Sequence, residues 1–300
     1  MKTLAALKNQ VHQEQKQVVS VANAADTEVL IAVKTAVSEE LCSFLLVGNE
    51  ADIKTAAKQV ELDLTSSAIR IQHETSDVSL AAVKAIHDKQ AQILMKGNVS
   101  TKSLLKAVLH KEYGLRTGRV LSHVALFEVP SQDRLIFLTD AAMNIDPSLQ
   151  EKVEIIQNTV QVASAIGLDL PKVASIAPVE VVNEAMQSTI DAAILTQMQK
   201  RGQIQGCLVD GPLAFDNAVS IEAAKQKGIT SDVAGKADVL LVPTIDVGNA
   251  LYKSFMYFSQ AKVAAIVSGA KAPIVLTSRA DSAESKLYSL SLALVSSKTF

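Results

Sequence analysis

The chain has no tryptophan among its 300 residues, and aromatic residues make up only 4% of it. A core with so few aromatic rings must consist mainly of Ala, Val, Leu and Ile, which favours helices packed on a sheet over a β-sandwich. Hydrophobic residues still make up 48% of the chain, so a sizeable core is expected. This length predicts either one large domain or two domains of ordinary size.

Cysteine, basic runs and long apolar runs are also scarce. The only two cysteines, Cys42 and Cys207, lie in apolar runs with no CxxC motif and no His/Cys cluster at metal-ligand spacing, so we expect buried thiols, no metal site and a reducing cytoplasm. The formal net charge of −2 and the absence of a basic run make a nucleic-acid partner unexpected. Met1–Leu4 lead into a polar helix rather than a signal sequence, and no apolar run has membrane-spanning length, so no membrane partner is expected.

Motifs of the common α/β enzymes are absent as well. There is no G-x-G-x-x-G fingerprint for a dinucleotide, no Walker A sequence, and no G-x-S-x-G elbow of an α/β-hydrolase. The histidines are scattered without an H-x-x-x-H pair, and His123, inside an apolar strand, is expected to be structural.

What the sequence does contain is an alternation of short β-favouring runs with amphipathic stretches of helical length. This alternation predicts parallel βαβ units and therefore an α/β fold. Strands are expected at Val29–Val33, Phe44–Val47, Ala68–Gln72, Ile93–Met95, Arg119–Val129, Leu135–Leu138, Val173–Ile176, Cys207–Asp210, Val239–Val242, Val263–Val267 and Ile274–Leu276. Helices are expected at Ala51–Gln59, Ser79–Asp88, Ser100–His110, Leu149–Ile166, Gln187–Arg201, Asn217–Lys227, Gly248–Gln260 and Asp281–Ser296.

One pair of strands interrupts this alternation. Arg119–Val129 and Leu135–Leu138 flank a short turn around Pro130–Asp133, which predicts an antiparallel hairpin. We expect the chain to pass there from a first domain into a second, and the last strand and helix to return to the first. The predicted domains are residues 1–128 plus 272–300, and an inserted domain of residues 129–271.

The last strand-to-helix junction is the most informative segment. Ser278 and Arg279 follow an apolar strand and precede a helix, whose first turn has free N–H groups and a partial positive charge, so this junction suits a phosphate-like anion. The same residues also fit an ordinary capping box, with Ser278 as the cap and Asp281 three residues later. Both interpretations are open on this segment alone.

Polar residues also follow several other predicted strands, where ligands bind in open α/β sheets. These segments begin at Lys96, Thr139, Asp210 and Pro243. Each has a structural alternative, because Gly97 and Gly211 suit turns with positive φ, and Asp216 and Asp246 suit helix caps.

Several segments, in this order, resemble the phosphate acyltransferase family, the phosphate acetyl/butyryltransferases. The resemblance extends from about Ile93 to the C-terminus and is carried by Met95–Thr101, Gly114–Val124, Leu208–Ala218, Val233–Pro243, Gly248–Lys253 and Thr277–Ser282. The forms L-R-T-G-R-V-L-S-H and D-G-P-L-A-F-D-N are those of the butyryl branch.

The resemblance implies two α/β domains, each a three-layer αβα structure like that of isocitrate and isopropylmalate dehydrogenases, with a cleft between them. It implies transfer of a short acyl group between coenzyme A and inorganic phosphate, written as butyryl-CoA plus phosphate giving butyryl phosphate plus CoA. It also implies a homodimer or larger homo-oligomer in which coenzyme A is a substrate and no cofactor or metal is tightly bound.

The family's Ser-Arg pair falls on Ser278 and Arg279. An arginine of the acetyl branch falls on Lys106. The acetyl branch's catalytic aspartate falls near Glu284, so either Asp281 or Glu284 is expected to be the catalytic base. The expected catalytic residues are Ser278, Arg279 and Asp281. The expected substrate-binding residues are Lys96, Asn98, Ser100, Lys106, Arg116, Asp210 and Asn249.

Other functions stay open at this point. The first alternative is a phosphate acetyltransferase, since acyl groups that differ by one methylene are separated by only about 1–3 kcal/mol in an apolar pocket. A more distant alternative is a metal- and NAD-dependent dehydrogenase of the same fold, using Asp210, Asp216 and Asp246. The last is a binding or regulatory protein that kept the fold without catalysis.

Overall fold

The computed structural model describes residues 1–11, 17–276 and 282–300. The chain forms two compact units, which we call the central unit (Met1–Leu4 and Val120–Val263) and the terminal unit (Ala5–Arg119 and Ala264–Phe300). The predicted division into domains stays a prediction. Ser278, Arg279 and Asp281 lie outside the described residues.

The sheet of the terminal unit has the strand order β3-β2-β1-β4-β11-β10. Strands β3, β2, β1, β4 and β11 run parallel, and β10 pairs antiparallel with β11. Its strands are β1 (Val18–Ala22), β2 (Ser43–Gly48), β3 (Ile69–His73), β4 (Ile93–Lys96), β10 (Lys262–Ser268, which begins at the end of the central unit) and β11 (Ile274–Val275).

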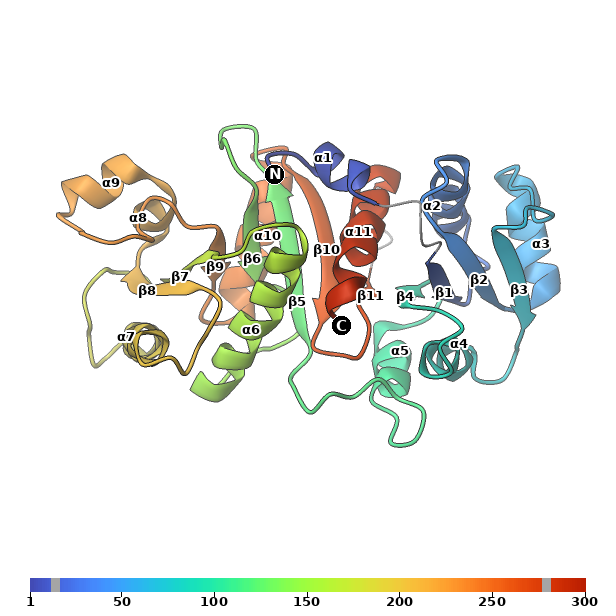
Figure 1. Ribbon diagram of the computed structural model, residues 1–300, viewed down its shortest axis with the longest axis horizontal. Helices are drawn as coiled ribbons and strands as arrows, with labels where there is room; N and C mark the ends of the chain where they lie inside the picture. The colour runs from blue at the N-terminus through green and yellow to red at the C-terminus, as the bar shows by residue number, and fades with distance from the viewer. Residues whose placement is uncertain (12–16, 277–281) are drawn as a thin grey trace. The chain divides into compact units, whose positions relative to one another are not determined.

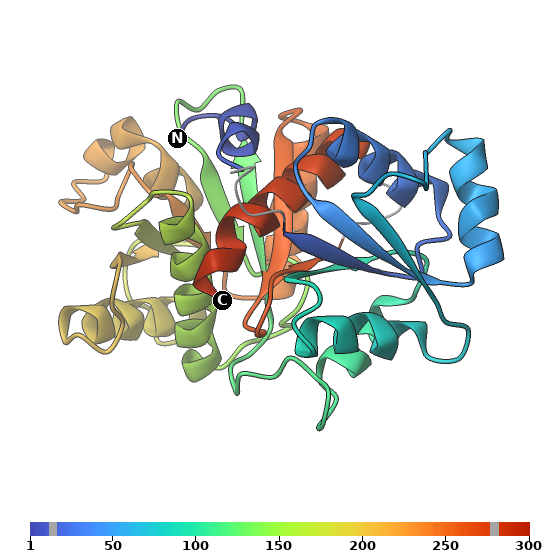
Figure 2. The same ribbon diagram turned by 45° about the vertical axis from the view of Figure 1, so that its right-hand side comes forward.

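Helices cover both faces of this sheet. In Figures 1 and 2, α2, α3 and α11 lie on one face of the terminal unit, and α4 and α5 lie on the other. The helices are α1 (Leu4–Asn9, whose first residue is assigned to the central unit), α2 (Thr27–Ser38), α3 (Glu50–Gln59), α4 (Val78–His87), α5 (Thr101–Val108) and α11 (Ala283–Ser296), followed by a 3₁₀ turn (Ser297–Thr299).

The predicted strand at Val29–Val33 is wrong, because these residues lie inside α2. Asp26 caps that helix by accepting a hydrogen bond from the Val29 amide. Helix α2 packs against both α3 and α11, so its apolar surface is broad. Its sequence therefore lacks the alternation of apolar and polar residues that indicates a helix. The first strand is instead β1, whose apolar run is interrupted in the sequence by Ser20. The buried Ser20 hydroxyl donates to the Ala82 carbonyl oxygen at 3.0 Å.

Helix α11 is held in place by a hydroxyl group. The backbone N–H of Ala265 in β10 donates to Ser289 Oγ at 2.9 Å, and both groups are buried. Other buried serines of α11 donate to backbone carbonyl oxygens of the same helix. Ser291, for example, donates to the Leu287 carbonyl oxygen at 2.8 Å. Ser289 therefore fixes the position of α11 along the sheet.

The sheet of the central unit has the strand order β5-β6-β9-β7-β8. The predicted hairpin is confirmed, since β5 and β6 pair antiparallel, and the other neighbouring strands run parallel. Its strands are β5 (Ser122–Glu128), β6 (Ile136–Thr139), β7 (Lys172–Ile176), β8 (Leu208–Leu213) and β9 (Val239–Leu241). Its helices are α6 (Leu149–Ala165), α7 (Gln187–Lys200), α8 (Phe215–Val219), α9 (Ile221–Gln226) and α10 (Ile245–Tyr257).

Two adjacent residues of β5 show that this sheet is also covered on both faces. Asn158 of α6 donates to Ser122 Oγ at 2.9 Å, whereas the ring of His123 packs on Tyr252 of α10, with 5.8 Å between the ring centres. Neighbouring residues of a strand point to opposite faces. Helices α6 and α10 therefore cover opposite faces, and the predicted α/β class with helix layers around the sheet is confirmed.

One predicted helix of the central unit is two helices in the structure. The helix predicted at Asn217–Lys227 is divided at Ser220, which ends α8 and caps α9 by accepting from the Ala223 amide.

Within the part of the chain that the structure describes, no helix is long and apolar enough to cross a membrane.

A buried ion pair joins α6 to α7. Lys152 Nζ lies 2.6 Å from Asp191 Oδ2, the side chains are only 6% and 10% exposed, and Gln187 donates to the second carboxylate oxygen. We expect Asp191→Ala to lower the free energy of unfolding by about 3–5 kcal/mol, because it leaves a buried ammonium without this partner. Urea denaturation measures the change. The double variant Lys152→Met/Asp191→Leu is the control and should recover most of the loss; a loss below about 1 kcal/mol in Asp191→Ala would contradict the prediction.

Candidate active site

The candidate site lies where the strand order of the terminal unit changes direction. Strands β2 and β3 lie on one side of β1, and β4 lies on the other. Ligands of open α/β sheets bind beyond the carboxyl ends of the strands at such a point. A hollow of about 480 Å³ is lined there by residues that follow β1 and β4, together with residues of α2, α3 and α11.

The loops after β1 and β4 are locked together by their backbones. Gly97 N–H donates to the Ala22 carbonyl oxygen at 3.0 Å, and Asn98 N–H donates to the Asn23 carbonyl oxygen at 2.8 Å. The Asn23 side-chain amide returns a hydrogen bond of 2.8 Å to the Asn98 carbonyl oxygen. Gly97 is thus required by this close approach and not by a positive φ, and the corresponding turn interpretation is wrong.

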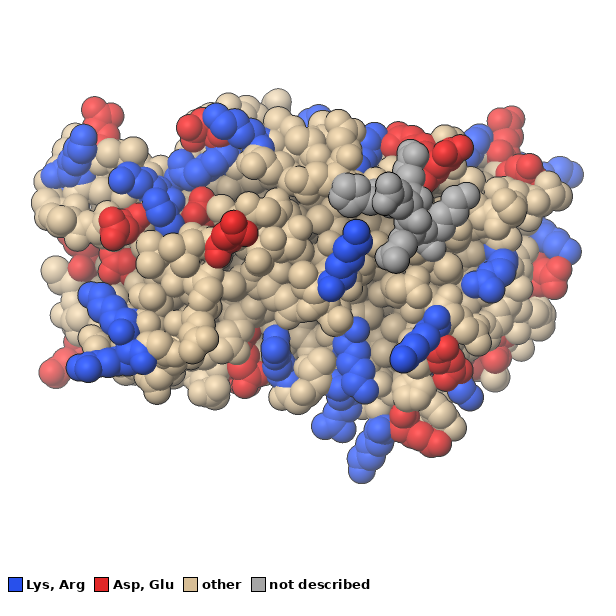
Figure 3. All heavy atoms as spheres, viewed as in Figure 1, with Lys and Arg blue, Asp and Glu red and all other residues tan. Residues whose placement is uncertain are grey.

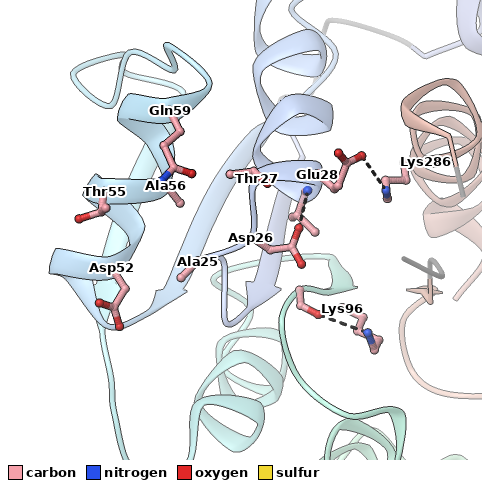
Figure 4. A pocket seen from close by; sticks show the side chains of 12 residues that line it. Ala25, Asp26, Thr27, Glu28, Asp52, Thr55, Ala56, Gln59, Lys96 and Lys286 are labelled. Atoms are coloured by element: carbon pink, nitrogen blue, oxygen red, sulfur yellow. Dashed lines mark hydrogen bonds and ion pairs between the residues drawn. The ribbon is translucent and has the colours of Figure 1, made fainter. Parts of the chain in front are cut away.

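Two lysines line the same side of the hollow (Figure 4). Lys96, at the end of β4, is half-buried and donates to the Gly97 carbonyl oxygen at 3.3 Å. Lys286, in the first turn of α11, has a side chain that is only 2% exposed, and its ammonium lies 3.5 Å from Glu28 Oε2. Two cationic groups therefore border the cavity from β4 and from α11.

The opposite wall is polar and partly acidic. Asp52, Thr55 and Gln59 of α3 line the hollow on the side away from the two lysines (Figure 4). Asp26 and Thr27 complete the lining at the first turn of α2. The hollow thus offers cations at one end and hydroxyl, amide and carboxylate groups at the other.

The start of α11 shows which residue caps this helix. The cap of α11 is Ser282, whose hydroxyl oxygen accepts from the Ser285 amide at 3.1 Å. The capping box predicted for Ser278 and Asp281 is therefore wrong as an account of this helix. At the other end of the junction, Val275 of β11 pairs in parallel with Met95, so β11 ends beside Lys96.

Three other predicted substrate-binding residues belong to the segment after β4. Asn98 is exposed in the loop that its backbone holds against β1. Ser100 caps α5 by accepting from the Ser103 amide at 3.0 Å. Lys106 is exposed in the last turn of α5 and does not line the hollow.

Arg116 lies at the opposite end of β11 from Lys96. Its backbone forms an antiparallel bridge with Ala270, in the loop that precedes β11, and the neighbouring Thr117 hydroxyl donates to the Gly269 carbonyl oxygen. Arg116 and Arg119 are exposed, and basic side chains gather over the segment that follows α5 (Figure 3). Within the terminal unit, the structure therefore separates Arg116 from the hollow.

The remaining predicted residues, Asp210 and Asn249, lie in the central unit. Asp210 is half-buried near the end of β8 and accepts from the Gly211 amide at 2.9 Å. Asn249 is exposed on α10 and donates to the Ala141 carbonyl oxygen at 3.5 Å. Gly211 also has no positive φ, and its close neighbour is Ser175.

The helix-cap interpretations of Asp216 and Asp246 are wrong. Ala214 is the N-cap of α8 and Thr244 is the N-cap of α10, so both aspartates lie in first turns. Over residues 1–11, 17–276 and 282–300, no three His, Cys, Asp or Glu side chains lie close enough to hold a metal ion.

Comparison with known proteins agrees with this picture. The family model described as phosphate acetyl/butaryl transferase matches residues 2–77 and 67–294. The probable phosphate butyryltransferase of Bacillus subtilis is 54% identical over 288 residues, covering 94% of each chain. The phosphate butyryltransferase of Clostridium beijerinckii is 50% identical, covering 92% of this chain and 91% of its own. The phosphate acetyltransferase of Thermotoga maritima is 44% identical, covering 92% and 94%.

Solved structures with a similar fold include another phosphotransacylase. A branched-chain phosphotransacylase from Enterococcus faecalis superposes with a TM-score of 0.81 at 37% identity, covering 94% of this chain and 99% of its own. A 4-hydroxythreonine-4-phosphate dehydrogenase from Salmonella typhimurium shares the fold alone, with a TM-score of 0.57 at 13% identity over 94% of this chain and 100% of its own. The dehydrogenase-like fold that the sequence predicted is confirmed.

The chain belongs to the phosphate acetyl/butyryl transferase family. The predicted activity, transfer of an acyl group between coenzyme A and phosphate, is confirmed at the level of this family. Lys286 was missed as a candidate, although a lone lysine inside the apolar run of α11 was a visible signal.

Gly97 offers a direct test of the contact between the loops. An added Cβ would lie 2.2 Å from the Asn23 carbonyl oxygen and 2.7 Å from that of Ala22, and neither backbone atom can move freely. We expect Gly97→Ala to lower the free energy of unfolding by about 1–3 kcal/mol and to reduce turnover by displacing Lys96. Denaturant melts and acyl-transfer assays measure both. Lys102→Ala, an exposed change on α5, is the control. Wild-type stability and turnover of Gly97→Ala would contradict the close contact between the loops after β1 and β4.

Proposed function

We propose that this chain is a butyryl transferase, which converts butyryl-CoA and inorganic phosphate into butyryl phosphate and coenzyme A. The relatives with 54% and 50% identity carry the butyryl name, whereas the Thermotoga relative with the acetyl name is 44% identical. Acetyl transfer is the second candidate, supported by that same relative.

The observation that carries the proposed site is the position of the two ends of the 277–281 segment. The segment leaves β11 beside Lys96 and enters α11 one turn before Lys286, since the Lys286 amide donates to the Ser282 carbonyl oxygen. Five residues span at most about 18 Å. We infer that Ser278 and Arg279 face the same anion as the two lysines.

The proposed chemistry brings two anionic substrates together, so charge neutralisation and positioning are its main requirements. Arg279 would hold phosphate through paired N–H donors, and Ser278 would donate to a phosphate oxygen or to the oxyanion that forms on the thioester carbonyl. In the reverse direction Asp281 or Glu284 would take the proton of the CoA thiol. Glu284 is exposed in the first turn of α11 and accepts from the Tyr288 hydroxyl at 3.0 Å.

Direct transfer in a ternary complex is proposed over an acyl-enzyme. Burial raises the pKa of Cys207 to about 11 and raises that of Cys42 still further, so neither thiol supplies a thiolate near neutral pH. The proposed substrate-binding residues stay Lys96, Asn98, Ser100, Lys106, Arg116, Asp210 and Asn249. Coenzyme A is proposed as a substrate without a tightly bound cofactor, and the enzyme as a cytoplasmic homodimer or larger homo-oligomer.

The acyl preference is tested with a series of acyl-CoA substrates. We expect kcat/KM for butyryl-CoA to exceed that for acetyl-CoA at least about tenfold, because an apolar pocket gains about 1–3 kcal/mol for each added methylene. Release of the CoA thiol with and without phosphate measures the rates. A preference for acetyl-CoA would select the second candidate, and no phosphate-dependent release with any acyl-CoA would remove both.

Arg279→Ala tests the proposed phosphate contact. We expect turnover to fall about 10²–10³-fold while the melting temperature stays close to that of wild type, because the proposed role of Arg279 is to donate to the transition state. Steady-state kinetics and thermal melts separate the two effects. Arg201→Ala, an exposed change at the end of α7, is the control, and near-normal turnover of Arg279→Ala would end the proposed role.

A further inference from the structure

The side chain of His110 closes the turn that follows α5. Its Nδ1 accepts hydrogen bonds from the backbone N–H groups of Glu112 and Tyr113, at 3.2 Å each. Two other side chains accept in the same pattern, from the amides two and three residues further on. They are Asn49 at the start of α3 and Asp140 after β6. An imidazole at His110 therefore occupies a position that Asn or Asp usually fills.

The backbone of this turn is closely packed. Gly114 N–H donates to the His110 carbonyl oxygen at 3.1 Å. A Cβ on Gly114 would lie 2.2 Å from that oxygen, so this close approach requires glycine. The next residue, Leu115, donates through its N–H to the Val108 carbonyl oxygen at 2.7 Å. The His110 ring stacks on the Tyr113 ring, with 5.6 Å between the ring centres and 11° between their planes. The turn therefore follows a tightly constrained path.

The turn leads directly into the segment that carries Arg116. The Leu115 carbonyl oxygen accepts from the Lys271 amide at 2.8 Å, and Arg116 forms its antiparallel bridge with Ala270. Leu115 is buried, whereas Arg116 is exposed. The backbone that carries the guanidinium is thus held on one side by the turn at His110 and on the other by the loop before β11.

We propose that His110 is a positioning residue, whose neutral imidazole holds the turn and thereby keeps Arg116 in place for a phosphate group of coenzyme A. Within the terminal unit Arg116 lies apart from the hollow, so the phosphates of a long substrate suit it better than the inorganic phosphate proposed to bind beside Lys96. An imidazole nitrogen accepts a hydrogen bond only while it carries no proton, so a proton on Nδ1 of His110 removes both amide bonds. This inference rests on the proposed function for the identity of the substrate.

A second imidazole lies against the same tyrosine. The His87 ring packs edge-on against Tyr113 with 5.9 Å between the ring centres, and Lys84 Nζ lies 4.4 Å from the centre of the Tyr113 ring. Ionisable groups around the cluster include Lys84, His87 and Asp88 of α4, Lys106 of α5, and Lys111, Glu112 and Tyr113 of the turn. Because His87 contacts the ring and lies on a different helix, it serves as the matched control for His110.

Calorimetric binding of coenzyme A tests the proposal without acyl transfer. His110→Phe keeps an aromatic ring beside Tyr113 but has no nitrogen to accept a hydrogen bond, and it should raise the Kd of coenzyme A about tenfold. His110→Asn restores an acceptor for the same two amides and should bind within about threefold of wild type. In an Arg116→Ala background, His110→Phe should add less than about twofold, because its effect acts through that arginine. An unchanged Kd in His110→Phe, or the same loss in both backgrounds, would overturn the proposal.

A pH series gives a second readout. Between about pH 8 and pH 5, where imidazole groups gain a proton, the Kd of coenzyme A should rise more steeply for wild type than for His110→Asn. The phosphates of coenzyme A titrate in both measurements alike, so the difference between the two proteins isolates the imidazole. His87→Asn removes the other imidazole beside Tyr113 and should keep the wild-type slope. Equal slopes for wild type and His110→Asn would overturn the proposal, even if His110→Phe does not fold.

The steady-state kinetics distinguish this inference from the proposed function. His110→Phe should raise the KM of butyryl-CoA and leave that of butyryl-pantetheine, which lacks the phosphates of coenzyme A, unchanged. An equal rise for both substrates would exclude the role in phosphate binding, and wild-type KM values in folded His110→Phe would refute the inference while the acyl transfer activity stands. The expected pattern of coenzyme A binding without thiol release from any acyl-CoA would support the inference and remove the proposed activity. No binding of coenzyme A to the wild type would end both.

Discussion

The backbone contact between the loops that follow β1 and β4 determines the geometry of the candidate site. Gly97 approaches the carbonyl oxygens of Ala22 and Asn23 so closely that no other residue fits without movement. That contact fixes the end of β4, and the parallel pairing of β4 with β11 then places the start of the last junction beside Lys96. Because Gly97 has no side chain, the two loops can approach closely, and this approach determines where the Lys96 side chain lies.

The charges of the site follow from where helices and strands end. Lys96 ends a strand, while Glu28 and Lys286 lie in the first turns of α2 and α11. A carboxylate is favoured in such a turn and an ammonium is not, and the Glu28 carboxylate supplies negative charge beside Lys286. Acyl transfer to phosphate supplies such charge in both directions, because phosphate, acyl phosphate and coenzyme A are all anions.

Much of the fold was predictable from local patterns. The hairpin at β5 and β6 and the helices α3, α6 and α7 followed from periodicity and turn residues. The strand predicted at Val29–Val33 failed because a helix packed on several sides shows a continuous apolar run, like a buried strand. Of the site, the sequence indicated Lys96 and the junction after β11, but the pairing of Lys286 with Glu28 joins residues far apart in the chain and follows only from the fold.

The hydrogen bond from the Ala265 amide to Ser289 has a consequence for insertions and deletions. It anchors α11 lengthwise against β10, while the register of β11 with β4 anchors the other end of the junction. The span between these anchors is therefore constant, and neither neighbour can slide to absorb an added or lost residue. The number of residues between β11 and Ser289 is therefore more tightly constrained than it would be for a helix that could slide along the sheet.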